Sequence, residues 1–281
     1  MTDVIEIFQA PFMQRALAAL LLAGLSGAVV GAFIVLRRMA FMGGALTHTI
    51  LPGVVAAYAL EVSLYLGAFA AALLTAAGVN LLAAKGELRE DTAIGVMLSG
   101  MFALGVLLMA LVDSFADFSS ILFGNILAVA PGDLWLIGGI TAFVLLCVAA
   151  FYKELELSTV DPAYCEQIGA HPGWMRVLIL VLTAASVVSA LKLMGALLTT
   201  ALLLIPAATA TLFGRSLAMV IVIGAVVATV GGVGGMVLSV DRDWPAASSI
   251  VLVLWGCFTA GWLFKRVLRF RRTGGLATSA A

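Results

Sequence analysis

The sequence has very little charge for its length. Of its 281 residues, 11% are Asp, Glu, Lys or Arg and 63% are hydrophobic, and the mean hydropathy is +1.18. Soluble domains carry about 25% charged residues, so this chain has too few ionic groups to cover a water-facing surface. Each transmembrane helix needs roughly 20 apolar residues, and the length therefore allows at most about nine or ten spans. We expect an all-α polytopic integral membrane protein with no room for a large extramembrane enzyme.

Other absences exclude further classes of protein. The three cysteines, Cys147, Cys165 and Cys257, lie far apart with no C-x-x-C spacing, which argues against a disulfide framework and a thiolate zinc site. The net charge is zero, from 15 basic and 15 acidic residues, so the charge of the chain favours no nucleic-acid partner. Residues 1–11 contain no Lys or Arg, unlike the basic start of a signal peptide. The first apolar run is therefore expected to stay as a span.

Motifs for catalysis and for nucleotide binding are also missing. The chain has no G-x-x-x-x-G-K-[ST] and no Gly-Lys dipeptide, so it cannot cradle ATP phosphates in a P-loop. If ATP drives its activity, another subunit must hydrolyse the ATP. The absence of H-E-x-x-H and G-x-S-x-G argues against an intramembrane protease or lipase.

Apolar runs separated by polar residues predict nine spans in a single transmembrane domain, residues 1–281. The second run is short and the sixth and seventh nearly touch, so eight or ten spans remain alternatives. The spacing shows no fixed-period repeat and no inverted symmetry, which weakens an interpretation as a secondary carrier. The predicted spans are 13–36, 44–60, 64–84, 92–112, 133–152, 175–191, 195–213, 217–240 and 246–266.

Basic residues are distributed unevenly among the predicted loops. With the N-terminus outside the cell, twelve Lys and Arg residues fall on the cytoplasmic side and three on the outer side, as the positive-inside rule requires. Acidic residues split seven inside and eight outside. We therefore expect an external N-terminus and a cytoplasmic C-terminus. The twelve cations are Arg37, Arg38, Lys85, Arg89, Lys153, Arg176, Arg215, Lys265, Arg266, Arg269, Arg271 and Arg272.

The polar stretch 153–176 contains signals for one short helix. Asp161 suits an N-cap, Pro162 suits the first helical position, and Gly169 suits the stop after the last turn. These signals predict a helix over residues 162–168, ~10 Å long. A helix this short has little stability alone. It is expected either to dock on a cytoplasmic partner through one face, which carries Tyr164 and Ile168, or to lie on lipid headgroups.

The second predicted span contains a histidine close to a proline. His48 is flanked by Thr47 and Thr49, and an ionisable residue in a membrane span is a functional candidate by default. Pro52 has no N–H, so in a helix it leaves the carbonyl group of His48 without its usual partner. An imidazole and a carbonyl oxygen at one level could contact a transition metal. The alternative is a histidine that bonds to a neighbouring helix.

A similar interruption occurs in the seventh predicted span. Pro206 leaves the carbonyl group of Leu202 without its helical donor. Broken helices are tolerated at membrane depth where they are buried in protein or line a cavity. The segment is therefore either a second part of a pathway or a simple kink.

An ordered series of motifs resembles the permease subunits of bacterial zinc and manganese ABC transporters. The similarity covers nearly the whole chain, from Pro11 to Phe264. Its segments are Val35-Leu36-Arg37-Arg38-Met39-Ala40-Phe41, Ala45-Leu46-Thr47-His48, Leu51-Pro52-Gly53-Val54, Glu90-Asp91-Thr92-Ala93-Ile94-Gly95, Phe123-Gly124-Asn125-Ile126-Leu127, Asp161-Pro162 to Gly169, Gly195-Ala196-Leu197-Leu198, Pro206-Ala207-Ala208-Thr209, and Asp243 and Pro245 ahead of Ser249-Ile250-Val251-Leu252-Val253.

The resemblance implies partners in a bacterial plasma membrane. It implies a pore formed by two permease copies, a cytoplasmic ABC ATPase that binds ATP, and an extracytoplasmic metal-binding protein that delivers the ion. The short cytoplasmic helix would then be the coupling helix that receives ATPase movements. The residues assigned to it are Asp161, Pro162, Tyr164, Glu166, Ile168 and Gly169.

One position departs from the family pattern. The resemblance implies Asp-Ala-Leu-Ser-His in the second span, whereas this chain has Gly44-Ala45-Leu46-Thr47-His48. Losing the carboxylate removes an anionic ligand that attracts a dication and offsets its desolvation. Three alternatives follow: the cargo passes with only imidazole, carbonyl and hydroxyl contacts, it is a different metal, or it is a metal chelate.

The sequence therefore predicts a transport subunit rather than an enzyme. The expected function is alternating-access transport of a divalent transition metal, zinc or manganese, by the membrane-spanning permease of an ABC importer. The pathway candidates are His48, Thr47, Thr49, Pro52 and Pro206, with His48 as the metal contact. No cofactor is expected to bind to this chain, and membrane lipid is expected to surround it. The rivals are an ATPase-independent channel or secondary carrier, and an intramembrane enzyme or scaffold.

Overall fold

The computed structural model describes residues 7–84, 88–112, 124–167 and 172–277, and this part of the chain is helical with no strand. Nine of its helical segments are long and apolar enough to cross a membrane. The all-α fold and the number of spans predicted from the sequence are confirmed. The spans are Pro11–Leu36, Phe41–Ala59, Leu64–Ala83, Glu90–Leu111, Pro131–Ala150, Gly173–Leu191, Leu193–Thr211, Leu217–Arg242 and Ala246–Leu268.

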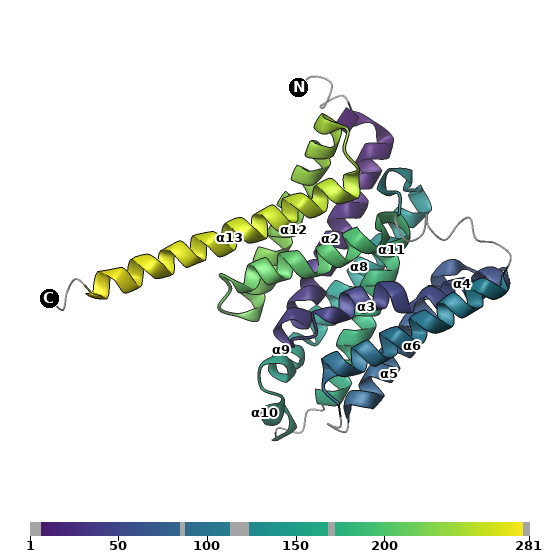
Figure 1. Cartoon of the computed structure of the whole chain (residues 1–281), viewed down its shortest axis with the longest axis horizontal. Coiled ribbons are helices and arrows are strands. Elements are labelled where there is room, and N and C mark those ends of the chain that lie inside the picture. Colours follow the sequence, from purple (N-terminus) through teal and green to yellow (C-terminus); the bar gives the residue numbers. More distant parts are fainter. Residues whose placement is uncertain (1–6, 85–87, 113–123, 168–171, 278–281) are drawn as a thin grey trace.

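The helices follow one another along the chain in the order that Figure 1 shows. Their bounds are α2 Pro11–Leu36, α3 Phe41–Thr49, α4 Leu51–Ala59, α5 Leu64–Ala84, α6 Glu90–Leu111, the 3₁₀ turn η1 Ile126–Ala128, α8 Pro131–Ala150, α9 Tyr152–Val160, α10 Pro162–Gln167, α11 Pro172–Thr211, α12 Leu217–Arg242 and α13 Ala246–Ala277.

The second span consists of two helices. α3 ends at Thr49 and α4 begins at Leu51, with Ile50 between them. Pro52 lies in the first turn of α4, where its missing N–H is no loss. The interruption predicted near Pro52 is therefore present, two residues before the proline.

The polar stretch after α8 contains a helix that sequence reasoning missed. α9 follows α8 after Phe151 and ends at Val160. Its sequence, YKELELSTV, is too polar to register as a span, but Leu155 is fully buried and fixes the helix against the bundle. The predicted short helix appears directly afterwards as α10. Two of its predicted residues, Ile168 and Gly169, lie outside the described residues.

The helix α11 is broken at Gly195. This residue has φ 72° and ψ 171°, a backbone conformation that disfavours every residue with a β-carbon. Gly124, with φ 63°, packs against the break, since a β-carbon there would collide with the backbone of Met194 and Gly195. In Figure 1 the half of α11 after the break runs in a different direction from the half before it. The sixth and seventh spans are thus two segments joined by a sharp change of direction, and the change is at Gly195 rather than at Pro206.

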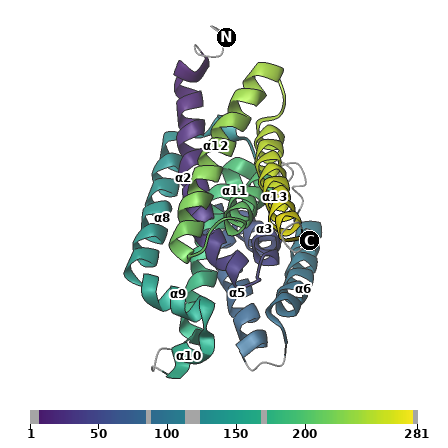
Figure 2. The same ribbon diagram turned by 90° about the vertical axis from the view of Figure 1, so that its left-hand side faces the viewer.

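The two halves of α11 form the centre of the fold together with α2. Figure 2 shows α11 between α8 on one side and α6 on the other. α2 approaches the second half of α11 through glycines. A β-carbon on Gly27 would lie 3.3 Å from the carbonyl oxygen of Leu202, and one on Gly31 would collide with that of Leu203. Small residues permit such close packing where lipid gives helices no hydrophobic reason to associate.

The substitution Gly31→Ala tests this packing. Because the colliding atom belongs to the backbone of α11, the helices must separate, and we expect a loss of about 1–3 kcal/mol in stability. Gly95→Ala in α6 is the matched control, since a β-carbon there meets nothing within 4 Å. It should be neutral or gain about 0.5–1 kcal/mol from helix propensity. Unfolding of the purified protein in detergent measures both, and equal midpoints for the two variants would contradict the packing.

Candidate functional site

A cleft of about 510 Å³ lies between α3 and the second half of α11. Its walls are built from two helical faces. Gly44, Thr47 and His48 of α3 are spaced i, i+3 and i+4, so they lie on one face. The face of α11 consists of two rows with a spacing of four residues. These rows are Ala196, Thr200 and Leu204, and Leu197, Ala201 and Ile205.

The polar groups of the cleft are few and offer acceptor atoms. The Thr47 hydroxyl donates to the carbonyl oxygen of Gly44 at 2.7 Å, and the Thr200 hydroxyl donates to that of Ala196 at 2.7 Å. Because each hydroxyl proton is used within its own helix, the oxygen lone pairs remain available to a cation. Leu197 is 56% exposed, so the cleft opens onto the surface of the chain.

The imidazole of His48 is the strongest potential ligand in the cleft. The side chain is half-buried and its ring packs edge-on against Phe102 of α6, with 6.0 Å between ring centroids and 82° between ring planes. This contact orients the imidazole. Within the described residues the imidazole makes no hydrogen bond, so neither ring nitrogen is held by a neighbouring side chain.

Among the described residues that line it, the cleft has no carboxylate. At Gly44 a β-carbon would lie 3.7 Å from the Thr200 methyl group, an ordinary contact, so the backbone leaves space for a side chain that this sequence does not supply. The described part of the chain contains no group of three or more His, Cys, Asp and Glu side chains that could hold a metal ion. A cation in this cleft would be contacted by one imidazole and by neutral oxygens.

Three residues predicted for the pathway do not line the cleft. Thr49 is fully buried and its hydroxyl donates to the carbonyl oxygen of Leu46 at 3.4 Å. Pro52 is buried at the start of α4. Pro206 lies one residue beyond the cleft lining, and the Leu202 carbonyl that it deprives of a donor faces Gly27 of α2. The carbonyl group that Pro206 leaves without a helical donor therefore lies at the contact between α2 and α11.

Sequence reasoning missed the cleft residues of α11. Among them Thr200 supplies the only polar side chain of that wall in the described structure. The small and polar positions Ala196, Thr200 and Ala201 stand at i, i+4 and i+5, a spacing that was a signal for one face of a helix. The sequence alone did not indicate which helix packs opposite that face.

The short helix α10 exposes one side and anchors the other. An oxygen of the Asp161 carboxylate accepts a hydrogen bond from the backbone N–H of Tyr164 at 3.0 Å, so Asp161 caps the helix and Pro162 begins it. Cys165 is fully buried, whereas Tyr164 is 51% exposed and Glu166 is exposed. An aromatic side chain thus projects from a helix whose opposite side is held by the protein.

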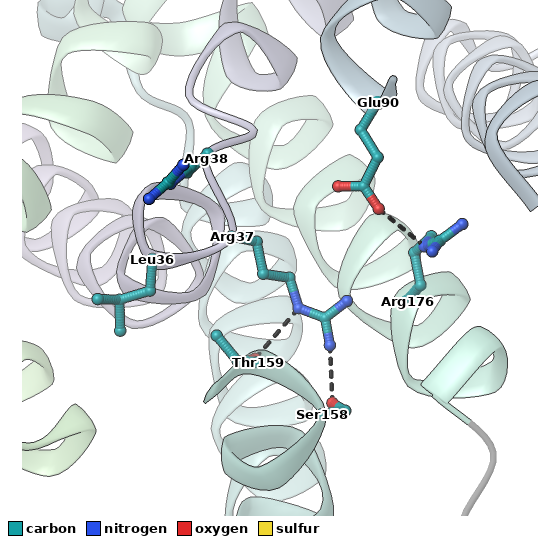
Figure 3. A pocket seen from close by; sticks show the side chains of 7 residues that line it. All are labelled: Leu36, Arg37, Arg38, Glu90, Ser158, Thr159 and Arg176. Atoms are coloured by element: carbon teal, nitrogen blue, oxygen red, sulfur yellow. Dashed lines mark hydrogen bonds and ion pairs between the residues drawn. The ribbon is translucent and has the colours of Figure 1, made fainter. Parts of the chain in front are cut away.

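An arginine connects the end of α9 with the end of α2 (Figure 3). Arg37 Nε donates to the Thr159 hydroxyl at 3.1 Å and Nη2 donates to the Ser158 hydroxyl at 2.7 Å. Burial lowers the pKa of Arg37 to about 10, with Glu90 opposing this shift and Arg176 adding to it, so the guanidinium remains charged at neutral pH. The connection joins the segment before α10 to the turn that leads into α3.

Comparison with known proteins identifies the family. The model of the ABC 3 transport family matches residues 9–265. The chain belongs to the ABC 3 transport family. The manganese transport system membrane protein MntC of Halalkalibacterium halodurans is 36% identical over 92% of this chain and 89% of its own. The chelated iron transport system membrane protein YfeD of Yersinia pestis is 33% identical over 88% of this chain and 84% of its own.

A solved structure gives the same result. A chain in the structure of PsaBC from Streptococcus pneumoniae in complex with Fab matches with a TM-score of 0.84 and 32% identity, over 96% of this chain and 99% of that chain. The present ABC 3 family member is therefore a multi-pass membrane transport protein, as the sequence predicted, and not an enzyme.

The substitution Gly44→Asp tests whether the cleft binds cations. The new carboxylate would face His48 one turn away, and we expect roughly tenfold or greater affinity for Mn²⁺ because the bound charge gains an anionic partner. Gly44→Asn has a similar shape without the charge and should change affinity little. Titration of the purified protein with Mn²⁺ measures the effect, and equal affinities for the two variants would exclude Mn²⁺ from the cleft.

Proposed function

We propose that this chain is the permease subunit of an ABC importer that moves a divalent transition metal, manganese above all, through the cleft between α3 and α11. The observation that carries the proposal is the imidazole of His48, which makes no hydrogen bond within the described residues and lies in an open cleft of an ABC 3 family protein. A dication cannot cross hydrocarbon unaided, so the transport route must supply ligands and exclude lipid.

The names of the relatives favour manganese and iron as the cargo. MntC is named for manganese and YfeD for chelated iron. Oxygen ligands suit Mn²⁺, and imidazole suits iron, zinc and copper. The cleft offers one imidazole and several oxygens, a set that suits manganese and iron(II). Zinc, which the sequence also suggested, has no support from these names. The second candidate is a metal chelate, which would fit a cleft that lacks its own carboxylate.

The energy would come from a partner subunit. A cytoplasmic ABC ATPase would bind the exposed face of α10, with Tyr164 at the contact. Movement of α10 would reach α9, then α2 through Arg37, and then α3, which begins four residues after Arg37. The cleft would thereby change the side of the membrane that it faces. This arrangement requires the N-terminus outside and α10 in the cytoplasm of a bacterial cell. The excess of basic residues in the loops on the side of α10 supports that orientation.

A second copy of the chain would complete the pathway. The cleft has two walls and an open side next to the exposed Leu197. An ion carried there by one chain alone would contact lipid, so a facing copy is needed to close the route. An extracytoplasmic metal-binding protein would deliver the ion to the outer side of this pair.

The decisive experiment is uptake into vesicles that contain the chain with its ATPase. We expect ATP-dependent uptake of Mn²⁺, with Fe²⁺ as competitor and Zn²⁺ as the third ion tested. His48→Ala should lower uptake about tenfold or more with subunit assembly intact, because it removes the only imidazole among the described residues that line the cleft. The control Thr49→Val alters the next residue, outside the cleft, and should transport normally. Full uptake without ATPase would instead support a channel or a secondary carrier.

The assignment of α10 has its own test. Tyr164→Asp places a charge on the exposed face of α10, and we expect weaker ATPase binding and loss of transport-coupled hydrolysis. Tyr164→Phe keeps the aromatic face and should retain binding. Co-purification of the ATPase with each variant measures the effect. Undiminished binding to Tyr164→Asp would place the ATPase contact elsewhere.

A further inference from the structure

A pocket of about 230 Å³ lies where four helices end on the side of α10. Three of its residues are arginines and one is a glutamate, while the others are a leucine and two hydroxyl residues. Figure 3 shows the pocket from close by. Its lining consists of Leu36, Arg37, Arg38, Glu90, Ser158, Thr159 and Arg176.

The positive charge of this pocket exceeds the negative charge available to it. The single carboxylate, Glu90, pairs with Arg176 at 2.9 Å. Among the described residues Arg37 hydrogen-bonds only to the hydroxyls of Ser158 and Thr159, and hydroxyls do not neutralise a cation. Figure 3 shows the remaining guanidinium nitrogen of Arg37 directed toward the Glu90–Arg176 pair. A partly desolvated cation in this position calls for an anion beside it.

We propose that this pocket binds the phosphate group of an anionic phospholipid, held between the guanidinium groups of Arg37 and Arg176. Guanidinium groups match the oxygens of a phosphate with parallel N–H donors, more closely than lysine does. The volume is below the roughly 300–1,000 Å³ of pockets that enclose drug-sized ligands, so it suits a headgroup rather than a nucleotide.

The position of the pocket places it at the level of lipid headgroups. Arg37 directly follows the last residue of the first span, and Glu90 is the first residue of the fourth. Trp174, which is 65% exposed and lies two residues before Arg176, belongs to the residue type enriched at membrane interfaces. Leu36 lines the pocket and is 38% exposed, so an acyl chain can leave the site along an apolar surface. Basic pockets between membrane helices are known to hold such headgroups.

A phosphate bound in this pocket would connect the ends of three helices. Arg37 belongs to the end of α2 and its partners belong to the end of α9, while Arg176 opens α11. A phosphate between Arg37 and Arg176 would relieve their mutual repulsion and hold these three helix ends together. The assignment depends on neither the transported metal nor the ATPase.

The test compares lipid binding to the full-length purified chain and to three variants. The probes are dioleoylphosphatidylglycerol, dioleoylglycerol, which lacks the phosphate, and inorganic phosphate, and native mass spectrometry counts the bound molecules. We expect phosphatidylglycerol to bind and dioleoylglycerol not to compete. Arg37→Gln should weaken binding roughly tenfold or more, because one charged contact is lost.

Two further variants distinguish a change at this pocket from misfolding and from a general loss of surface charge. Glu90→Gln removes the carboxylate that competes for Arg176, so we expect binding to become severalfold tighter, a gain that misfolding cannot produce. Arg89→Gln removes a neighbouring exposed cation that does not line the pocket and should leave affinity unchanged. Inorganic phosphate binding with the same dependence on Arg37 and Glu90 would keep the site and make free phosphate its ligand. The proposal is overturned if Arg37→Gln and Arg89→Gln bind equally, or if Glu90→Gln weakens binding.

Discussion

The change of direction at Gly195 is the constraint on which the functional part of this protein depends. A positive φ angle is cheap only for glycine, and Gly124 supports the break from outside because it too lacks a β-carbon. Beyond the break, α11 presents Ala196, Thr200 and Leu204 toward α3. Without the break the chain would still cross the membrane, but the wall opposite His48 would be absent.

The second constraint is the backbone contact between α2 and α11. Lipid provides no hydrophobic drive for helices to associate, so close packing of small residues must hold the two together. Gly27 and Gly31 bring α2 against the carbonyl groups of Leu202 and Leu203. The proline at 206 contributes a carbonyl without a helical donor to this contact rather than to the cleft. The α11 wall of the cleft is therefore held in place by this close backbone contact with α2.

The ligand set of the cleft suits the proposed role in passing a cation on rather than storing it. Transport requires binding that is favourable enough for entry and weak enough for release. One imidazole with threonine oxygens meets that requirement better than a closed cage of carboxylates would. The charged residues instead gather at the helix ends, where Arg37 and the Glu90–Arg176 pair connect α2, α6, α9 and α11.

The sequence by itself determined the features that arise from composition and from near neighbours in the chain. These are the membrane environment, the nine spans, the interruption near Pro52 and the capped start of α10 at Asp161, because apolar length and capping depend on residues a few positions apart. It also singled out His48 as a histidine within a span. The helix α9 was not predicted, because its burial depends on contacts between Leu155 and helices that are distant in the sequence.

Only the tertiary structure decided which faces meet. The chain has 29 glycines, and nothing local distinguishes Gly195, where α11 breaks, from the glycines that serve packing. The same holds for Thr200 and Thr49: both are threonines of a span, yet one lines the cleft and the other is buried beside its own helix. Their difference comes from the direction that α11 takes after its break, which is set by contacts between residues far apart in the sequence.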